Sequence, residues 1–307
     1  MRVAILGSGS AGNAVVIESA GRRLLIDAGF SCRRLEKRMD SLGCAASDID
    51  ALLLTHEHGD HCSGADVFLR RYELPVYATE GTLRAAKLSE GATAKSQTIC
   101  SGEPFEIDGF RIEPFAIPHD AAEPVGFVVQ DEAGARFGLA SDMGSRSQLA
   151  WGRLRDLDIL VLETNHDLHM LRTGPYPWSL KQRVAGRYGH LSNREAADGL
   201  PDLLSSRLSN LVLYHLSKTN NLPALASEAI GERLDREGSR ARIVVAEQDV
   251  PTPWLEVVRG ETSTSSSGEQ PGSPIRSQLS LPGIFTSEET SPCAASLESN
   301  PTPTQQI

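Results

Sequence analysis

Four side chains that commonly bind metal ions lie within six residues of the chain, in the segment His56-Glu57-His58-Gly59-Asp60-His61. On an extended segment alternate side chains point the same way, so His56 and His58 can face one centre. A turn at Gly59 can then bring Asp60 and His61 to a neighbouring position. Imidazoles with a carboxylate suit zinc, and mixed nitrogen and oxygen sets also suit manganese or iron. A solvated polar loop is the alternative interpretation, but this density of ligand types favours a metal site.

A second motif, the segment Gly7-Ser-Gly-Ser-Ala-Gly12, satisfies the pattern G-x-G-x-x-G of dinucleotide-binding loops. That fingerprint requires a helix to begin at the loop, with its N-terminus facing the pyrophosphate. Here residues 13–18 are β-prone instead. We therefore interpret the loop as a tight turn beside a site, and we expect no nucleotide cofactor.

The elements that must position the histidine motif alternate between short β-prone runs and segments with helical spacing. Strands are predicted at 3–6, 14–18, 23–26, 51–55, 75–78, 105–107, 110–117, 126–130, 136–141, 159–163, 211–215 and 243–246. Helices are predicted at 32–42, 65–72, 81–88, 180–188, 193–204 and 224–236. Two strand-rich halves with helices gathered after each predict an α/β fold of two sheets packed face to face with helices outside.

Composition divides the chain near residue 260. Residues 1–259 hold all the predicted elements and are expected to form one domain, whereas 260–307 is rich in Ser, Thr, Pro, Gly and Glu. Such a segment buries too little apolar surface to offset its chain entropy, so we predict a disordered tail.

Charge and hydropathy restrict the environment and the partners. The net charge of −10 gives no global positive field, so a nucleic-acid partner would have to be held by local charge and metal ions. No run of about 18 apolar residues is present, and we expect no membrane span. Five cysteines lack paired spacing and are expected to be reduced thiols in a cytoplasmic protein. Nothing in the sequence indicates the oligomeric state.

The histidine motif, together with four residues farther along the chain, resembles the metallo-β-lactamase superfamily over residues 1–258. The four residues are Asp27 in Leu-Ile-Asp-Ala-Gly, His119 in Ile-Pro-His-Asp, Asp142 in Ala-Ser-Asp-Met-Gly and His215 at the end of Leu-Val-Leu-Tyr-His. The resemblance implies a four-layer αββα sandwich and a dinuclear metal-dependent hydrolase.

The same resemblance implies a role for each residue. The first ion would be bound by His56, His58 and His119, the second by Asp60, His61 and His215, and Asp142 would bridge both. The two divalent ions, zinc or manganese with iron as an alternative, would share a hydroxide and lower its pKa. Asp60 would also position this water and accept its proton. Asp27 is expected to support the metal ligands as a hydrogen-bond acceptor rather than to bind an ion.

A narrower resemblance concerns Gly189-His190-Leu-Ser-Asn193, which precedes His215-Leu-Ser217. This pair is similar to the late histidines of RNase Z and of carbon–phosphorus-lyase phosphodiesterases. By that match His190 would contact the scissile phosphate or act as a general acid. A helix-capping histidine on a solvated turn is the alternative.

Segments 7–13, 118–127, 163–167, 189–193 and 215–221 together resemble the YycJ/WalJ group of this superfamily. These are small bacterial proteins associated with 5′-to-3′ exonuclease activity on double-stranded DNA. The resemblance therefore implies a DNA substrate. The C-terminal extension of this chain departs from the pattern of the group.

Local charge bears on the same question. Residues 168–194 contain no acidic residue but five basic ones, with aromatic residues between them. Such a stretch could hold phosphates and stack on a terminal base, or it could be a helix with a solvated basic face and a core tryptophan. Five residues are candidates for substrate contact: Asn165, His166, Arg183, Arg187 and Asn193. A helix-capping Asp167 is the alternative role for the loop at 165–167.

Three functions from different classes follow. The first is a metal-dependent phosphodiesterase or nuclease with DNA as the favoured substrate. The second is a small-molecule hydrolase of the same fold, acting on a thioester, a lactone or a cyclic phosphodiester. The third is a metal-bound regulatory or scaffold protein without turnover, against which the complete ligand set argues. Replacing His190 by alanine separates the first two, because only the first depends on that residue.

Overall fold

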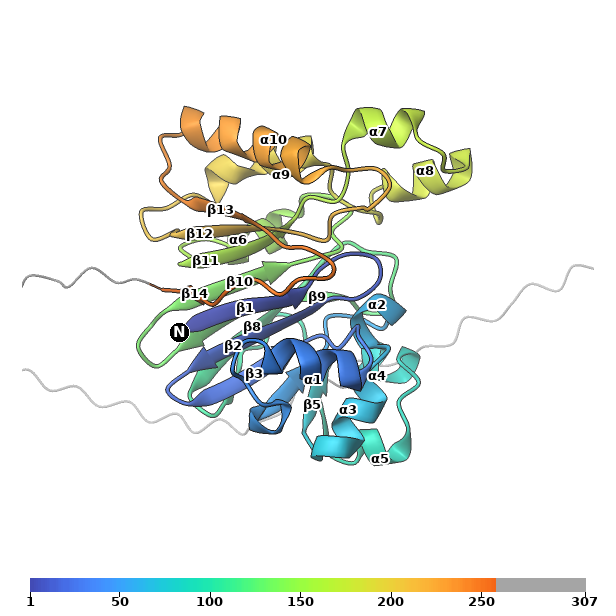
Figure 1. The fold of residues 1–307 in the computed structure, drawn as a ribbon, viewed down its shortest axis with the longest axis vertical. Helices are drawn as coiled ribbons and strands as arrows, with labels where there is room; N and C mark the ends of the chain where they lie inside the picture. Colours follow the sequence, from blue (N-terminus) through green and yellow to red (C-terminus); the bar gives the residue numbers. More distant parts are fainter. Residues whose placement is uncertain (258–307) are drawn as a thin grey trace, which may run out of the picture. The chain divides into compact units, whose positions relative to one another are not determined.

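Two mixed β-sheets pack face to face in the computed structural model, which describes residues 1–257 (Figure 1). The first sheet has the strand order β14-β1-β2-β3-β4-β5-β6 and the second has the order β13-β12-β11-β10-β9-β8-β7. The strands are β1 (Arg2–Gly7), β2 (Ala14–Ser19), β3 (Arg22–Ile26), β4 (Ala51–Leu53), β5 (Val76–Ala78), β6 (Ser96–Thr98), β7 (Phe105–Ile107), β8 (Phe110–Ala116), β9 (Val125–Asp131), β10 (Arg136–Ala140), β11 (Ile159–Glu163), β12 (Asn210–Tyr214), β13 (Arg242–Val245) and β14 (Leu255–Glu256).

Each sheet combines an antiparallel part with a parallel part. Strands β1, β2 and β3 form the predicted antiparallel meander, and β3 through β6 are parallel to one another. In the second sheet β7 through β10 are antiparallel, and β10 through β13 are parallel. Parallel strands end at the same edge of a sheet, and this edge is where ligands bind in open α/β folds.

Helices cover the outer face of each sheet. The described helices are α1 (Cys32–Asp40), α2 (Gly59–Cys62), α3 (Ala65–Tyr72), α4 (Glu80–Ala85), α5 (Glu90–Thr93), α6 (Gln148–Arg153), α7 (Leu168–Thr173), α8 (Trp178–Val184), α9 (Asn193–Gly199) and α10 (Pro223–Arg236), with short 3-10 turns η1 (Ala46–Asp48) and η2 (Leu200–Asp202). All but α2, α7 and α8 lie on a sheet face. Leu35 of α1 and Phe68 of α3 pack on the first sheet. Trp151 of α6 and Ile230 of α10 pack on the second.

The strands are buried on both faces because of this layering. In β1, Val3 and Ile5 point into the core between the sheets, whereas Ala4 and Leu6 point to the helices outside. Alternate residues of a strand face opposite sides, so one apolar run supplies two cores. The result is a helix–sheet–sheet–helix sandwich, which confirms the predicted αββα fold class.

The predicted elements are present, with differences at their ends. Helix α3 and strand β11 have the predicted bounds. The helix predicted at 180–188 instead begins at Trp178, after Pro177, and ends at Val184, before Gly186. Proline favours a helix start and glycine favours a helix end, and this punctuation outweighs the apolar spacing. The short edge strands β6 and β14 were not predicted, because Ser-Gln-Thr contains no apolar residue and Leu-Glu only one.

Several expectations about the chain can be compared with the described residues. No described helix is long and apolar enough to cross a membrane. The expectation of reduced cysteines is met by Cys32, Cys44 and Cys62, while Cys100 does not meet it and Cys293 lies outside the described residues. The predicted tail at 260–307 also lies outside them, so the division of the chain near residue 260 stays a prediction. The cytoplasmic location stays a prediction as well.

Candidate metal centre

The candidate site lies where strands from both sheets end. Asp27 follows β3 and His56 lies shortly after β4, both in the first sheet. In the second sheet Asp142 lies just after β10, Glu163 ends β11 and His215 follows β12. The two parallel halves of the fold therefore bring polar side chains from distant segments to one place.

Three of these strand-end residues have an unusual backbone conformation. Asp27, Asp142 and His215 have positive φ angles of 61°, 54° and 55°. Few residues other than glycine adopt this left-handed region, although Asp and His do so more often than most. Each such residue costs on the order of 1 kcal/mol or more, so the surrounding fold must hold it in place. Three cases at one site indicate that the fold sacrifices local stability to orient these side chains.

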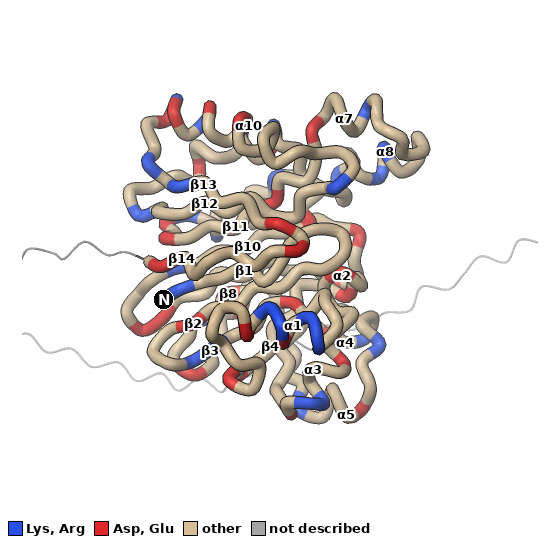
Figure 2. Tube along the Cα trace, viewed as in Figure 1, with Lys and Arg blue, Asp and Glu red and all other residues tan. Residues whose placement is uncertain are grey.

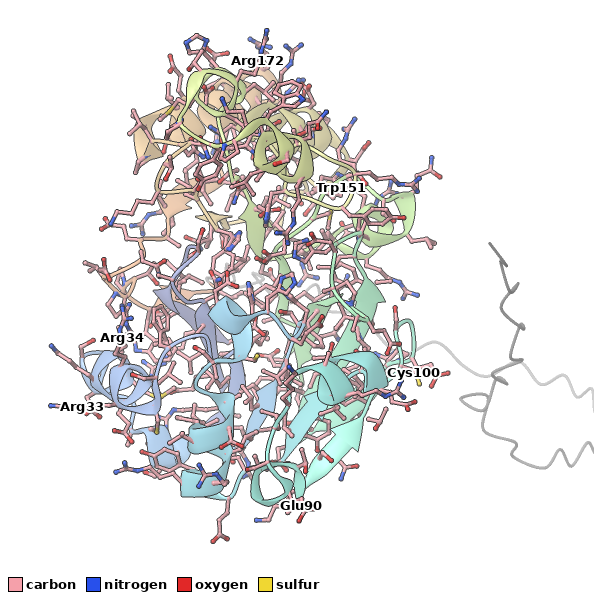
Figure 3. The ribbon with its side chains drawn as sticks, turned by 90° about the vertical axis from the view of Figure 1, so that its right-hand side faces the viewer. Arg33, Arg34, Glu90, Cys100, Trp151 and Arg172 are labelled. Carbon is pink, nitrogen blue, oxygen red and sulfur yellow. The ribbon has the colours of Figure 1, made fainter. Side chains whose placement is uncertain are left out.

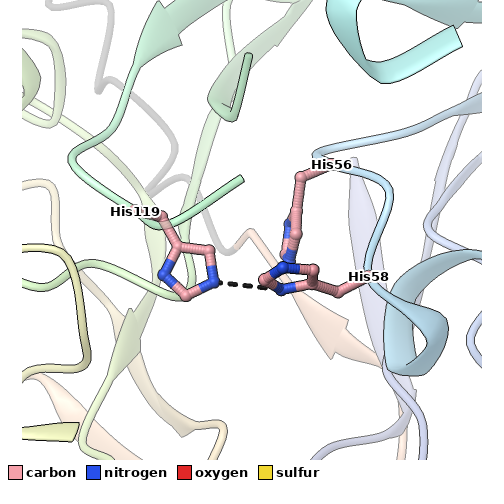
Figure 4. Close-up of side chains that lie close together, drawn as sticks. All are labelled: His56, His58 and His119. Atoms are coloured by element: carbon pink, nitrogen blue, oxygen red, sulfur yellow. Dashed lines mark hydrogen bonds between the residues drawn. The ribbon is translucent and has the colours of Figure 1, made fainter. Parts of the chain in front are cut away.

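The first group of ligand-type side chains comprises His56, His58 and His119 (Figure 4). Their ring nitrogens lie within 4.8 Å of one another, and Nε2 of His119 is 3.2 Å from Nδ1 of His58. His56 and His58 come from the predicted motif, and His119 comes from the segment that follows β8 of the second sheet. The structure thus brings together the three residues predicted for the first ion.

Two observations within this group fit a cation. Nε2 of His56 is buried and has no hydrogen-bond partner. Burial also holds the pKa of His56 well below its usual value, which leaves a neutral imidazole with a free lone pair. Unsatisfied buried polar atoms are rare in proteins, and a metal ion would satisfy this one. Nδ1 of His119 lies 3.2 Å from the carbonyl oxygen of Gly189, which leaves Nε2 for the centre of the group.

The second group comprises Asp60, His61, Asp142 and His215, whose ligand atoms also lie within 4.8 Å of one another. Nε2 of His61 is 3.0 Å from Oδ2 of Asp142, and Nε2 of His215 is 3.1 Å from Oδ2 of Asp60. Oδ1 of Asp142 is also 3.9 Å from Nε2 of His119, in the first group. Asp142 therefore lies between the two groups, as a bridging residue must.

The electrostatics of the second group favour positive charge. Burial opposes protonation of His61 and His215, but nearby carboxylates, chiefly Asp142, raise the pKa of His61 well above its usual value and that of His215 to about 10. Burial likewise opposes ionisation of Asp142, yet His215 and His61 hold its pKa well below the usual range. A buried cluster of carboxylates requires compensating cations, which either protonated imidazoles or metal ions can supply. This donor set therefore suits divalent metal binding.

Asp27 lies behind His61, where it was expected. Its Oδ2 atom accepts a hydrogen bond from Nδ1 of His61 at 2.7 Å. The backbone N–H and the hydroxyl of Thr55 donate to Oδ1 at 2.8 and 3.0 Å. A carboxylate that accepts from Nδ1 fixes the tautomer of the imidazole and leaves Nε2 free to bind an ion.

Glu163 is a site residue that the sequence reasoning missed. It is fully buried, and its Oε1 atom lies 2.8 Å from Nδ1 of His190 and 3.0 Å from Nδ1 of His215. Its Oε2 atom accepts from the backbone N–H groups of Met143 and Leu191. Burial opposes its ionisation, but the charge and hydrogen bond of His190 lower its pKa. The available signal was one carboxylate at the end of an apolar strand, which is weak by itself.

His190 lies beside both groups. Its Nδ1 atom contacts Glu163 and is 3.6 Å from Oδ1 of Asp142. Its side chain is 21% exposed and lines the cavity above the site, so Nε2 is left for a ligand in that cavity. Burial opposes protonation of His190, but the Glu163 carboxylate raises its pKa.

The glycine-rich loop contributes two further side chains that were not predicted. The amide nitrogen of Asn13 lies 3.1 Å from Nε2 of His61, and Ser8 accepts a hydrogen bond from the backbone N–H of His215 at 2.6 Å. Gly12 has a φ of +147°, and a Cβ there would lie 2.6 Å from the Phe30 ring. Strand β2 follows the loop, as expected from its β-prone sequence.

A cavity of about 360 Å³ opens above the two groups. One side is lined by predicted site residues, namely His58, Asp60, His119, Asp142, His190 and His215. The other side is lined by Leu180, Arg183 and Val184 of α8. Nε of Arg183 donates to Oδ2 of Asp120 at 2.6 Å, which ties α8 to the segment that carries His119.

The structure does not bring all predicted substrate contacts to this cavity. Only Arg183 lines it. Asn165, His166 and Asn193 are buried and lie outside its lining, and the two asparagines form hydrogen bonds within the loops behind the site. Asn165, for example, donates to the carbonyl oxygen of His215 at 2.8 Å. Arg187 is exposed outside the lining, with its guanidinium carbon 5.8 Å from the centre of the Tyr188 ring.

The comparisons with known proteins agree with this geometry. Residues 22–216 match the family model described as the beta-lactamase superfamily domain. The chain belongs to the metallo-β-lactamase superfamily. Within this superfamily it is 34% identical over 266 residues to exodeoxyribonuclease WalJ of Streptococcus pneumoniae, which covers 83% of this chain and 98% of the relative. It is 33% identical over 240 residues to exodeoxyribonuclease YycJ of Bacillus anthracis, which covers 78% of this chain and 90% of the relative.

A solved structure confirms the metallo-β-lactamase fold independently. The metallo-β-lactamase fold protein YhfI of Bacillus subtilis superimposes with a TM-score of 0.62 at 17% identity, over 82% of this chain and 98% of that protein. At this identity the match speaks for the fold alone. The sequence matches to YycJ and WalJ confirm the predicted relationship to that group.

Proposed function

We propose that this metallo-β-lactamase superfamily member is a metal-dependent nuclease that removes nucleotides from DNA in the 5′-to-3′ direction. The observation that carries the proposal is the position of His190, which Glu163 holds between the two groups of ligand-type residues and the cavity. A general acid at this place suits a phosphodiester, because its leaving alkoxide must gain a proton. The names of the relatives YycJ and WalJ support DNA as the substrate.

Two divalent ions fit the two groups. The first would be held by His56, His58 and His119, the second by Asp60, His61 and His215, and Asp142 would contribute to both. When bound, such ions lower the pKa of water and offset the negative charge of a phosphate group. The assignment of two ions rests on the position of Asp142 between two separate sets of ring nitrogens.

The side chains of the protein would then divide the remaining tasks. Asp60 borders the cavity and would orient the attacking water and accept its proton. His190 would give a proton from Nε2 to the oxygen that leaves the phosphorus, because Nδ1 is bound to Glu163. Arg183 would bind a phosphate oxygen at the mouth of the cavity, where it now contacts Asp120.

The test uses the purified full-length protein with Mn²⁺ or Zn²⁺ and DNA duplexes labelled at either the 5′ or the 3′ end. A 5′-to-3′ exonuclease releases the 5′ label at once as a short product, whereas a 3′-labelled strand shortens gradually. Single-stranded DNA and RNA of the same sequence define the substrate class. The Asp60→Asn variant is the control for a contaminating nuclease, and it should be inactive.

Two outcomes would contradict the proposal. A preparation with bound metal that cleaves no nucleic acid but turns over a thioester would favour the small-molecule hydrolase. Degradation that begins at the 3′ end would retain the nuclease but overturn the polarity.

A further inference from the structure

Helices α7 and α8, with the residues that follow α8, form a segment at 168–188 that we call the arm. Figure 1 shows both helices beyond the edge of the second sheet, beside α9 and α10. Helix α8 has no buried residue, and α7 buries only Leu171. A helix that buries none of its side chains contributes little to the core. Its sequence is therefore free to serve a surface role.

The charge of the arm is opposite to that of the whole chain. The arm has no acidic residue and four basic ones, although the chain has a net charge of −10. In Figure 2 the charged positions along α7 and α8 are all basic. Arg183 pairs with Asp120, but Arg172 and Arg187 form no ion pair within residues 1–257. Lys181 donates to the backbone oxygen of Arg172 at 2.8 Å. Positive charge that the protein leaves uncompensated attracts a polyanion.

The arm also exposes two aromatic rings. Trp178 is 70% exposed and Tyr188 is 54% exposed. Large apolar side chains at such exposure commonly mark a binding surface. The guanidinium group of Arg187 lies against the Tyr188 ring, at 5.8 Å from its centre. Basic groups interleaved with exposed rings are the usual features of a surface that holds the nucleic-acid backbone and stacks on its bases.

The arm is continuous with the cavity. Leu180, Arg183 and Val184 face the cavity, and at 100° per residue Trp178 lies on the opposite side of α8. Trp178 precedes Arg183 by five residues, or roughly 7.5 Å along the helix axis at 1.5 Å per residue. This distance corresponds to about two nucleotides at 3.4 Å each. Trp178 begins α8, whereas Arg187 and Tyr188 follow its last residue, so exposed groups of the arm lie on both sides of Arg183 along the chain.

We propose that the arm binds the stretch of nucleic acid adjacent to the phosphodiester in the cavity. Arg172 and Arg187 contact its phosphates, and Trp178 and Tyr188 stack on its bases or sugars. This inference rests on the proposed nuclease function and adds to it a second binding surface, which determines how tightly a long substrate is held.

The experiment measures binding by fluorescence anisotropy, with the metal-loaded full-length protein and a labelled DNA duplex that carries cleavage-resistant phosphorothioate linkages. The variants are the double substitution Arg172→Gln with Arg187→Gln, and Trp178→Ala. The control is Arg33→Gln with Arg34→Gln on α1, which removes the same charge; Figure 3 shows these two arginines far from Arg172. The thermal midpoint of each variant verifies its folding, and none of these residues is buried.

We expect the arginine pair to weaken DNA binding at least tenfold at 100 mM salt. It should also reduce the slope of log K against log salt by about two, since each phosphate contact contributes about 0.9. Trp178→Ala should weaken binding at least fivefold with the slope unchanged, because stacking releases no counterions. The control pair should change the dissociation constant by less than twofold.

Turnover separates the two proposals. For each variant, kcat/KM on the natural duplex is divided by kcat/KM on bis(p-nitrophenyl) phosphate, which is too small to extend from the cavity to Arg172, Trp178 or Arg187. A ratio below that of the wild type by at least tenfold for the arginine pair, and by at least fivefold for Trp178→Ala, supports the arm. Cleavage of both substrates with wild-type DNA affinity in every variant overturns the arm and leaves the nuclease function intact. Arm-dependent DNA binding without cleavage of either substrate would overturn the nuclease function and leave the arm as a DNA-binding surface. A change of oligomeric state with Trp178→Ala, and none in DNA affinity, would make the arm a protein–protein surface and also overturn the inference.

Discussion

Replacing Glu163 by glutamine changes one atom of the site and tests whether the site acts as a unit. A carboxylate only accepts hydrogen bonds, so both His190 and His215 must donate to Glu163 through Nδ1. Both imidazoles then present Nε2 toward the cavity or toward Asp60. In either orientation the amide of glutamine places its NH2 group against donors: against the two imidazole N–H groups at the Oε1 position, or against the backbone N–H groups of Met143 and Leu191 at the Oε2 position. Therefore two of these hydrogen bonds break, either at the imidazoles or at the backbone, or the imidazoles change tautomer.

The magnitudes differ between these two responses. Each hydrogen bond to a charged group contributes roughly 1.5–3 kcal/mol, so breaking both costs about 3–6 kcal/mol of unfolding free energy. A change of tautomer recovers part of this cost but places a proton on Nε2 of His215. The ring can then no longer bind an ion, and metal affinity should fall about 10–100-fold. Loss of the orientation of His190 should lower turnover by roughly 10²–10⁴-fold.

Three measurements on the Glu163→Gln variant test this reasoning: metal content after dialysis, unfolding free energy in urea, and the rate on a small phosphodiester. The matched control is Glu232→Gln, which removes an exposed carboxylate on α10. We expect the control to resemble the wild type in all three. A Glu163→Gln protein with full metal content, unchanged stability and a rate within twofold of the wild type would refute the role assigned to Glu163.

Three further outcomes are expected. His190→Ala should lower the phosphodiesterase rate by roughly 10²–10⁴-fold with metal content unchanged, and loss of metal would show that His190 serves as a ligand. Asp27→Asn should weaken metal binding about 10–100-fold in a titration calorimeter, because the amide cannot hold the His61 tautomer; an unchanged affinity would contradict the arrangement behind His61. Asp131 is buried, which opposes ionisation, but the Ser19 hydroxyl and other donors lower its pKa. Its stabilisation is therefore present above the unfolded pKa of about 3.9 and lost as pH falls through the lower folded value. Asp131→Asn should therefore reduce the decrease of the unfolding free energy at acid pH. An unchanged decrease would show that Asp131 is not its cause.

The sequence predicted the layers of the fold because burial on both faces has a plain signature. Strands such as β11 and β12 read as continuous apolar runs, and only a strand between two covered faces needs every residue to be apolar. Element ends were less predictable where a proline or glycine competes with apolar spacing, as at Pro177 and Gly186. The ligand-type residues could be found because four of them are crowded around Gly59.

Substrate contacts could not be predicted in the same way. His166 follows β11 in a polar segment, which is where a loop residue could reach a ligand, yet it is fully buried. Neither of its ring nitrogens has a hydrogen-bond partner in the described structure. Whether a polar side chain faces the cavity or the interior depends on packing between distant segments, and residue type does not record that packing. Arg183 reaches the cavity because α8 crosses its mouth, which spacing alone does not reveal.

The difference between metal ligands and the groups behind them has a chemical cause. Very few side chains can bind a transition metal, so the type of a ligand is itself informative. The group that orients an imidazole needs only to accept a hydrogen bond from Nδ1 or contact it, and many atoms in a protein can do so. The four cases here use four different partners: Asp27 for His61, Thr55 for His56, the backbone oxygen of Gly189 for His119, and Glu163 for His215. A pattern search therefore finds the imidazoles and misses Glu163, although its two hydrogen bonds connect His190 to His215 of the second group of ligand-type residues.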